Sequence, residues 1–310
     1  MTFTLPTLTG TRALVTGGSD GIGLVIASRL AAAGAEVILP VRNPHKGQAA
    51  ISAIHQATPD AVVSLRELDL SSLESVAALG ATLQREGDPI HLLVNNAGVM
   101  TPPNRQTTAD GIELQFGTNH IGHVALIAHL LPLLRAGRAR VTSQLSIAAN
   151  SGSINWDDLN WERSYSGGRA YSQSKIAFGL FALELERQSQ QHGWGITSTI
   201  SHPGIAPTNL LAAQPGMGRE RATGGRGLIG TLSRRGLLVG TADSAALPAL
   251  LAATSGAGGA FYGPSGLGHL AGPPAEQKLY SRLRSVDEAA RVWTVSEQRA
   301  KVSFPVAAAR

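Results

Sequence analysis

The run Ala13-Leu-Val-Thr-Gly-Gly-Ser-Asp-Gly-Ile-Gly23 decides the fold, because it predicts a short apolar strand that leads through a glycine-rich turn into a helix. Glycines let such a turn bend sharply and approach a pyrophosphate, and the helix N-terminus adds N–H groups and a positive dipole end. A glycine-rich turn without a ligand is the alternative, but this turn stands in the first strand–helix unit, where a dinucleotide binds. We predict a dinucleotide site that includes Gly17, Ser19, Asp20, Gly21, Ile22 and Gly23.

Short β-branched or leucine-rich runs alternate with longer helical segments after this turn. The alternation is typical of repeated βαβ units around a parallel sheet, and continuous apolar runs fit strands that are buried on both faces. The expected strands are 13–16, 36–39, 62–68, 90–94, 140–145, 196–201 and, as the last one, 260–263. The expected helices are 23–33, 45–56, 73–85, 112–134, 170–192 and 286–302, with a loop at 147–169.

The chain of 310 residues contains no linker, repeat or break in composition, so we predict a single α/β domain over 1–310. The segment 209–240 differs from the rest because glycine and arginine are frequent in it. Long segments of this kind in compact domains are usually either functional lids or disordered. We predict a substrate lid there, which suits a bulky apolar substrate with an anionic group; the alternative is a solvated loop.

Composition excludes several classes of protein. With 43% hydrophobic residues the chain can bury a sizeable core, and without cysteine it has no disulfide or thiolate chemistry. The net charge of +5 comes from scattered basic residues without a nucleic-acid motif, and no His and Cys cluster suggests a metal. The N-terminus lacks the features of a signal peptide, and no apolar run reaches the ~18 residues of a spanning helix. We expect a cytoplasmic protein without a metal, a nucleic-acid partner or a membrane span.

The tip of the second expected strand reads Pro40-Val-Arg-Asn43 and contains no carboxylate. An acidic residue at this tip would hydrogen-bond a ribose 2′-hydroxyl, whereas the guanidinium of Arg42 presents a fork that suits a 2′-phosphate. Arg42 therefore predicts NADP rather than NAD. The alternative is that Arg42 is an ordinary solvated cation of the loop.

Tyr171 and Lys175 are four residues apart on an expected helix, so they share one face of it. A phenol has a pKa near ~10, and a cation beside it favours the phenolate. The pair can therefore supply an acid and base at neutral pH. Such a pair alone is more often a surface tyrosine beside a long lysine side chain, so the rest of the chain must decide its meaning.

Three features occur in order along the chain: the glycine-rich turn, Asn95-Asn-Ala-Gly98 after the fourth strand, and the pair of Tyr171 and Lys175. Together they resemble the short-chain dehydrogenase/reductase family nearly from end to end. The run Asp110-Gly-Ile-Glu-Leu-Gln-Phe-Gly-Thr-Asn-His-Ile-Gly-His123 is similar to the branch of retinol dehydrogenases, WW-domain oxidoreductases and protochlorophyllide reductases. The resemblance implies a single Rossmann domain, with a doubly wound parallel sheet flanked by helices on both faces.

The resemblance also implies a catalytic set of Asn119, Ser146, Tyr171 and Lys175. Tyr171 would donate a proton to a carbonyl oxygen as the nicotinamide delivers hydride, and oxidation would be the reverse. Lys175 would lower the phenol pKa and bind the nicotinamide ribose, Ser146 would orient the carbonyl, and Asn119 would hold a water of the proton relay. Ser143 is the alternative serine, but Ser146 has the long spacing to the tyrosine that is seen in this branch.

Further cofactor contacts follow from the same resemblance. Beyond the turn they comprise Arg42, Asp69, Leu70, Asn96, Ala97, Gly98, Tyr171, Lys175, Pro203, Gly204 and Thr208. Asp20 departs from the family pattern, because many NADP-preferring members have a basic residue there, so the choice of cofactor rests on Arg42. His120 and His123 lie close to Asn119, and we expect them to pack and hydrogen-bond rather than to act as bases.

The sequence therefore predicts an NADP(H)-dependent oxidoreductase that transfers hydride between the nicotinamide and a carbonyl or a primary or secondary alcohol. Its partners would be NADPH and a small-molecule substrate. Members of the family often associate with a second copy, but the sequence does not decide between a monomer and a homo-oligomer. The alternative is an NADP-binding regulatory or scaffold protein with little turnover. The complete catalytic set counts against this alternative, because a protein freed from chemistry has no need for a hydroxyl, a phenol and an ammonium together.

Overall fold

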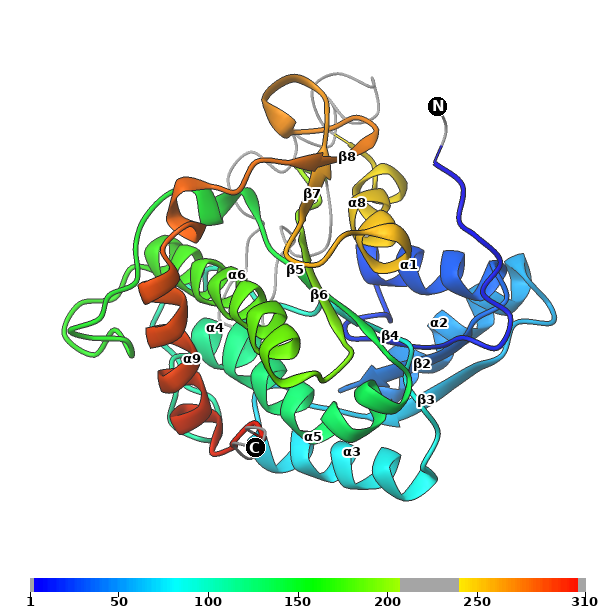
Figure 1. Cartoon of the computed structure of the whole chain (residues 1–310), viewed down its shortest axis with the longest axis horizontal. Coiled ribbons are helices and arrows are strands. Elements are labelled where there is room, and N and C mark those ends of the chain that lie inside the picture. Colours follow the sequence, from blue (N-terminus) through cyan, green and yellow to red (C-terminus); the bar gives the residue numbers. More distant parts are fainter. Residues whose placement is uncertain (1–2, 207–239, 306–310) are drawn as a thin grey trace.

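An eight-stranded sheet runs through the centre of the computed structural model, which describes residues 3–206 and 240–305 (Figure 1). The strand order is β3-β2-β1-β4-β5-β6-β7-β8; neighbours are parallel from β3 to β7, and β8 is antiparallel to β7. The strands are β1 Arg12–Val15, β2 Glu36–Val41, β3 Val63–Glu67, β4 Leu92–Asn95, β5 Arg140–Gln144, β6 Thr197–Ser201, β7 Phe261–Pro264 and β8 Pro274–Gln277. The predicted doubly wound α/β fold is confirmed.

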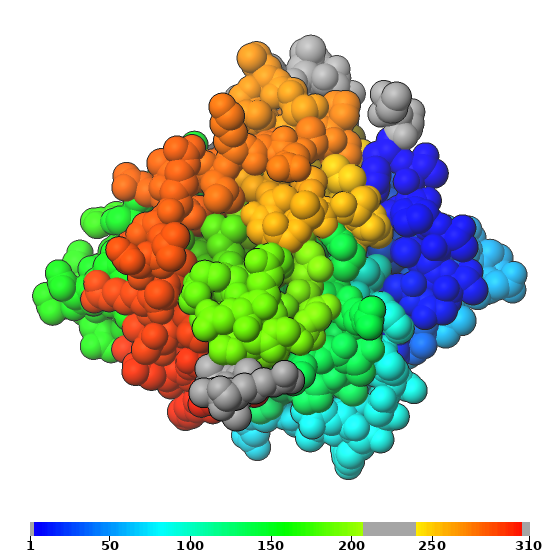
Figure 2. Space-filling view, in the orientation of Figure 1, coloured from blue at the N-terminus to red at the C-terminus, as the bar shows by residue number. Residues whose placement is uncertain are grey.

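Helices cover both faces of this sheet (Figure 1). One face carries α1 Gly21–Ala32, α2 Pro44–Ala57 and α8 Ala242–Ser255, and the other carries α3 Leu73–Glu86, α5 Gly122–Ala136, α6 Gly167–His192 and α9 Val286–Ala300. The described residues also contain five short helical turns: α4 Leu114–Phe116, η1 Gly117–Ile121, η2 Ile147–Asn150, η5 Leu267–His269 and η6 Ser281–Leu283. In the space-filling view the red segment that includes α9 packs along the green α6, so the C-terminal helix closes this side of the molecule (Figure 2).

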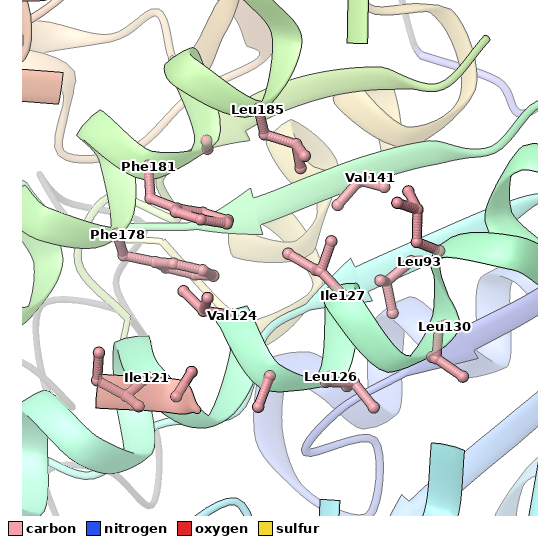
Figure 3. Close-up of a cluster of buried hydrophobic side chains, with 14 of the residues drawn as sticks. Leu93, Ile121, Val124, Leu126, Ile127, Leu130, Val141, Phe178, Phe181 and Leu185 are labelled. Carbon is pink, nitrogen blue, oxygen red and sulfur yellow. The ribbon is translucent and has the colours of Figure 1, made fainter. Parts of the chain in front are cut away.

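The strands bury side chains on both faces because successive residues point to opposite sides of a sheet. In β1, Leu14 belongs to the core beneath α5 and α6, whereas Ala13 and Val15 belong to the core beneath α1 and α8. Phe178 and Phe181 of α6 fill the first of these cores and extend toward α5 and the strands (Figure 3). The continuous apolar runs of the sequence therefore reflect burial on two sides.

The winding of the chain reverses between β1 and β4. From β1 the chain adds β2 and β3 on one side, and it then crosses to β4 on the other side. In sheets of this kind, ligands bind outside the carboxyl ends of the strands at the point of reversal. The glycine-rich turn follows β1 and the segment 95–98 follows β4, so the fold brings these two motifs to that point.

Two elements near the C-terminus differ from the prediction. The strand at 260–263 is not the last, because β8 follows it at the edge of the sheet. The sequence Pro-Ala-Glu-Gln of β8 lacks the β-branched and aromatic residues that mark strands, and proline is tolerated because the strand lies at the edge. The helix α8 has no counterpart among the predicted helices, since its nearly uniform alanine and leucine sequence contains Pro248 and lacks a clear polar face.

The predicted helix at 112–134 is a helical run with a wider turn inside it. The helix α4 ends at Phe116, the π-helical turn η1 follows, and α5 begins at Gly122. Single π turns inside α-helices occur frequently at functional sites. Asn119 lies in η1, so a predicted catalytic residue occupies the irregular part of this run.

The lid predicted at 209–240 lies outside the described residues, except for Gly240. The N–H of Gly240 donates to Ile205 O at 2.8 Å, so the described chain on both sides of this segment meets at one point. The described residues form one continuous sheet with a hydrophobic core on each face. The lid and the extent of the domain over 1–310 stay predictions.

Gly23 allows α1 to pack against the turn that precedes it. A Cβ at this position would lie 2.1 Å from Gly17 O and 2.5 Å from Asn96 Nδ2. We expect Gly23→Ala to lower the free energy of unfolding by about 1–3 kcal/mol, because overpacking forces the backbone to shift. Urea denaturation measures this change. Gly168→Ala is the control, since Gly168 is exposed and a Cβ there meets no atom within 4 Å; equal losses for the two variants would contradict the packing argument.

Candidate active site

The glycine-rich turn bends at Gly17, whose φ of 66° lies in the left-handed region. A Cβ on Gly17 would lie 2.9 Å from Ala97 Cα, so the turn approaches the segment after β4 as closely as the backbone allows. Asp20 caps α1, and its Oδ1 accepts the N–H of Gly21 at 2.7 Å. Inside the first turn of α1 there is no acidic residue, so the carboxylate of Asp20 at the N-cap is the acidic group at this end of the helix. This close turn beside a helix N-terminus fits the diphosphate of a dinucleotide.

The segments after β1 and β4 contain most of the predicted cofactor residues. They meet because β1 and β4 are neighbours, with Val15 opposite Val94. The predicted residues that this places together are Gly17, Ser19, Asp20, Gly21, Ile22, Gly23, Asn96, Ala97 and Gly98.

The hydroxyl of Thr16 joins these two segments. Its oxygen accepts the backbone N–H groups of Asn96 at 2.9 Å and Ala97 at 3.0 Å. On its other side, Nε2 of His123 lies 3.0 Å from Thr16 Oγ1, and Nδ1 of His123 lies 3.0 Å from Asn119 O. A carbonyl oxygen only accepts, so Nδ1 carries the proton and Nε2 accepts the Thr16 O–H. His123 therefore connects the turn to η1 as a neutral imidazole.

Ser146, Tyr171 and Lys175 meet at the carboxyl end of β5. The hydroxyl of Ser146 hydrogen-bonds the phenol of Tyr171. The ammonium of Lys175 donates from Nζ to Gln144 O at 2.9 Å. Tyr171 is only 7% exposed and Lys175 only 4% exposed, which excludes a surface tyrosine beside a solvated lysine.

The alternative serine, Ser143, lies inside β5 and is fully buried. Its neighbour on the adjacent strand is Asn95 of β4. The hydroxyl of Ser143 has no hydrogen-bond partner among the described residues, whereas that of Ser146 reaches Tyr171. The geometry therefore favours Ser146 as the serine beside the phenol.

Burial governs the protonation of the buried pair. Burial raises the pKa of Tyr171, and the hydrogen bond with Ser146 opposes this effect in part. Burial also lowers the pKa of Lys175 to about 8, so the ammonium is still mainly protonated at neutral pH. Tyr171 is therefore a protonated phenol at neutral pH in this structure. A lowering of the phenol pKa by Lys175 stays a prediction.

Asn119 uses its whole side-chain amide to hold two neighbouring segments. Its Oδ1 accepts the N–H of Val99 at 2.7 Å, and its Nδ2 donates to Val99 O and Ser174 Oγ, both at 3.0 Å. The hydroxyl of Ser174 donates in turn to Tyr171 O at 2.8 Å. Asn119 therefore ties the segment after β4 to the turn of α6 that carries Tyr171.

The remaining predicted cofactor residues follow the ends of other strands. Arg42 is exposed directly after β2. Asp69 follows β3, and its Oδ1 accepts the N–H and the O–H of Ser71 at 2.9 Å and 2.6 Å. Leu70 is buried after β3, Pro203 and Gly204 follow β6, and Thr208 lies outside the described residues.

Polar residues outside the predicted set complete the site. Gln144 Nε2 donates to Asn96 Oδ1 at 2.7 Å, and Asn96 Nδ2 donates to Thr16 O at 2.9 Å. Gln115 Oε1 accepts the N–H of Thr101 at 2.7 Å. These side chains hold the backbone in place and present no reactive group. Their residue types therefore match no catalytic motif in the sequence. The signal that points to Thr16 and Gln144 is their place at the ends of buried strands.

His120 and His123 are fully buried, which agrees with packing rather than acid–base roles. Burial lowers the pKa of both imidazoles to about 3, so neither one takes up a proton near neutral pH. Within 3–206 and 240–305, no three His, Asp or Glu side chains are grouped so that they could hold a metal ion. Among the helices of these same residues, none combines the length and apolar character needed to cross a membrane.

The fold and the site together define the class of protein. A doubly wound sheet with a glycine-rich turn after its first strand is the architecture of dinucleotide-binding proteins. The family model described as short chain dehydrogenase matches residues 11–217. The chain therefore belongs to the short-chain dehydrogenase/reductase family, and the predicted family is confirmed. It is similar to retinol dehydrogenases 11, 12 and 13.

Similar proteins cover different shares of the chain. Retinol dehydrogenase 13 of Homo sapiens is 43% identical over 206 residues, which are 66% of this chain and 61% of that protein. The match thus spans less than two thirds of that relative. A crystal structure of an uncharacterized protein from Mycobacterium paratuberculosis is 34% identical, with a TM-score of 0.76, and covers 99% of this chain and 100% of its own. Pseudomonas aeruginosa RhlG, solved as an NADP active-site complex, is 25% identical, with a TM-score of 0.60, and covers 81% and 92%.

Buried histidines should make the stability depend on pH. Burial lowers the pKa of His120 and His123 to about 3 and that of His202 to about 4, whereas an unfolded histidine has a pKa near ~6.5. Below pH ~6.5 the unfolded chain therefore binds protons that the folded chain does not. We expect the free energy of unfolding to fall between about pH 6.5 and pH 4, by up to ~1.4 kcal/mol per pH unit for each histidine.

Urea denaturation at a series of pH values tests this expectation. His120→Asn should lower the slope of the free energy of unfolding against pH between about pH 6 and pH 5. The decrease corresponds to nearly one proton taken up on unfolding, because one buried imidazole is removed. His55→Asn is the control, since His55 is exposed on α2. Identical slopes for the wild type and His120→Asn would show that burial of His120 does not exclude its proton.

Proposed function

We propose that this protein is an NADP(H)-dependent oxidoreductase that transfers hydride between the nicotinamide and a carbonyl compound or an alcohol. The observation that carries the proposal is the hydrogen bond between Ser146 and the buried phenol of Tyr171. The ammonium of Lys175 lies nearby, on the carbonyl of Gln144 at the carboxyl end of β5. Family membership and the glycine-rich turn support a nicotinamide dinucleotide as the cofactor. The NADP complex of Pseudomonas aeruginosa RhlG and the exposed Arg42 after β2 support NADP in particular.

The bound nicotinamide supplies or accepts the hydride. Tyr171 donates its phenol proton to the substrate oxygen in reduction and takes a proton from the alcohol in oxidation. Ser146 donates a hydrogen bond to the same oxygen and orients it. Lys175 holds a positive charge at the carboxyl end of β5, which stabilises the phenolate that remains after proton transfer. The raised pKa of Tyr171 keeps the phenol protonated at neutral pH, which is the form that donates a proton in reduction.

Asn119 contributes to the proton path through its backbone. Both N–H bonds of its side chain are already used within the protein, on Val99 O and Ser174 Oγ. A relay water would therefore meet the main-chain carbonyl of Asn119, whose position in η1 is held by the N–H of His123. In this proposal the amide of Asn119 fixes the geometry and its carbonyl contacts the water.

Tyr171→Phe tests the proposed acid. We expect the variant to lose at least ~100-fold in kcat for NADPH-dependent reduction of a panel of aldehydes and ketones, because general acid catalysis contributes about 10²–10⁴-fold. Retinaldehyde belongs in the panel, since retinol dehydrogenase 13 is similar to this chain. The dissociation constant for NADPH should change little, because the phenol acts on the substrate oxygen.

Tyr262→Phe is the matched control for Tyr171→Phe. Tyr262 is also a buried tyrosine, but it lies in β7 and its hydroxyl accepts the N–H of Ala257 at 2.9 Å. This variant should keep its activity. Full activity of Tyr171→Phe would refute the mechanism. Tight NADPH binding by the wild type with no turnover of any panel member would favour the regulatory or scaffold alternative.

Arg42→Ala tests the choice of cofactor. A guanidinium that contacts a 2′-phosphate contributes about 1.5–3 kcal/mol, so the dissociation constant for NADPH should rise about 10- to 100-fold while that for NADH stays nearly constant. Calorimetric titration with both cofactors measures the two constants. Arg135→Ala, at an exposed arginine in the last turn of α5, is the control. An equal loss of affinity for NADPH and NADH would show that Arg42 does not bind the 2′-phosphate.

A further inference from the structure

His202 lies directly after β6 and immediately before the turn Pro203–Gly204. Its backbone N–H donates to Tyr262 O at 2.9 Å, so it extends the pairing of β6 with β7 by one residue. Its side chain is fully buried, whereas histidine is on average only intermediate in burial. The imidazole therefore has a place inside the protein that needs an explanation.

The hydrogen bonds of His202 have a fixed direction. The backbone N–H of Gly204 donates to Nδ1 of His202 at 3.2 Å, so Nδ1 carries no proton. Nε2 then carries the proton and donates to Gln277 Oε1 at 3.1 Å. The amide of Gln277 continues the chain, because its Nε2 donates to Pro264 O at 2.7 Å. One line of hydrogen bonds thus runs from the turn after β6 through His202 to the edge strand β8.

Gly263 of β7 makes room for this line. A Cβ at Gly263 would lie 2.1 Å from Nε2 of His202 and 2.6 Å from Nε2 of Gln277. The rings of Phe261 and Tyr280 lie 5.3 Å and 5.9 Å from the imidazole and enclose it. Phe261 of β7, Gln277 of β8 and Tyr280 after β8 therefore surround the imidazole, and its hydrogen bonds allow one orientation of the neutral ring.

The imidazole stays neutral in this pocket. Burial lowers the pKa of His202 to about 4, the bond to Gln277 opposes this shift, and the nearby His269 adds to it. The phenol of Tyr280, whose pKa burial raises to about 12, carries no charge at neutral pH. Nδ1 of His202 is therefore available as an acceptor for the Gly204 N–H over the whole neutral range.

The turn itself is held from its other side by a loop. Gly204 has φ of 71°, and a Cβ there would lie 2.2 Å from Leu270 O. The next residue, Ile205, donates its N–H to the same Leu270 O at 2.8 Å. The imidazole and this carbonyl together define one conformation of the backbone at 203–205.

We propose that His202 is a positioning residue that, together with Gln277, holds the Pro203–Gly204 turn in the conformation that receives the nicotinamide carboxamide. The proposal rests on the proposed function, which puts this turn beside the carboxamide. His202 touches neither substrate nor cofactor in this role. Its acceptor atom acts on the cofactor only through the backbone of Gly204.

Two ligands separate this role from a purely structural one. NADPH carries the nicotinamide, whereas adenosine 2′,5′-bisphosphate carries the adenosine and the 2′-phosphate but no nicotinamide. We expect His202→Leu to raise the dissociation constant for NADPH about tenfold in calorimetric titration, which is the effect of one lost hydrogen bond. Binding of adenosine 2′,5′-bisphosphate should change less than about twofold, since its contacts lie at the ends of β1 and β2.

Two further variants follow the line of hydrogen bonds. His202→Asn should recover most of the NADPH affinity, because an asparagine side chain accepts the backbone N–H two residues ahead of it as Nδ1 of His202 does. Gln277→Leu should raise the dissociation constant for NADPH about two- to threefold and leave that for adenosine 2′,5′-bisphosphate unchanged. This variant tests the line of hydrogen bonds even where His202→Leu fails to fold. His129→Asn, at a half-buried histidine on α5, is the control and should leave both ligands unchanged.

The outcomes distinguish this proposal from the proposed function. The positioning role would be overturned if the variants bound both ligands equally more weakly, or if neither His202→Leu nor Gln277→Leu lowered the affinity for NADPH. The oxidoreductase proposal would stand in both cases. A wild type that binds neither ligand would overturn both proposals. A selective loss of NADPH in His202→Leu that His202→Asn restores would establish the role of Nδ1.

Discussion

The hydroxyl of Thr16 is the contact on which the site depends, because one oxygen joins three segments of the chain. It accepts two backbone N–H groups after β4, and it donates to the imidazole of His123 on α5. That donation fixes the proton of His123 on Nδ1, which holds the carbonyl of Asn119 in η1. These hydrogen bonds therefore connect the glycine-rich turn to the η1 segment that contains Asn119. An apolar side chain in place of Thr16 would leave two half-buried N–H groups and the buried imidazole of His123 without this partner, and the loss for the imidazole is about 1–3 kcal/mol.

Burial of the reactive groups is costly and has a chemical consequence. Desolvation raises the pKa of Tyr171 and lowers that of Lys175, so each group is pushed toward its neutral form. The protein opposes this with local hydrogen bonds: Ser146 on the phenol, and the carbonyl of Gln144 on the ammonium. The result is a protonated phenol on Ser146 and, one turn further along α6, an ammonium with a pKa of about 8 on the carbonyl of Gln144; in our proposal these two groups supply the acid and its stabilising charge.

The sequence predicts those parts of the molecule whose reasons are local. The turn at 16–23 needs glycine because of its own bends, and the first strands are apolar because both faces are covered. The edge strand β8 and the helix α8 escape prediction, because an edge strand tolerates proline and glutamate and a helix packed among alanines shows no periodicity. Likewise, no spacing rule relates Gln277 to His202, which meet across 75 residues of sequence. Polar groups that position backbone become visible only when the fold brings their partners together.

The two ends of the proposed dinucleotide site differ in how the chain builds them. The end at β1 is a continuous turn whose glycines and helix N-terminus lie within a few residues of one another. The end at β6 depends on distant segments. The Pro203–Gly204 turn is held by His202, whose side chain hydrogen-bonds Gln277 of β8, and by the carbonyl of Leu270 in the loop between β7 and β8. Changes in the antiparallel pair β7–β8 can therefore alter the nicotinamide end while the diphosphate end keeps its geometry. A motif in the first turn predicts that a dinucleotide binds, whereas in our proposal the orientation of its reactive end depends on the last strands of the sheet.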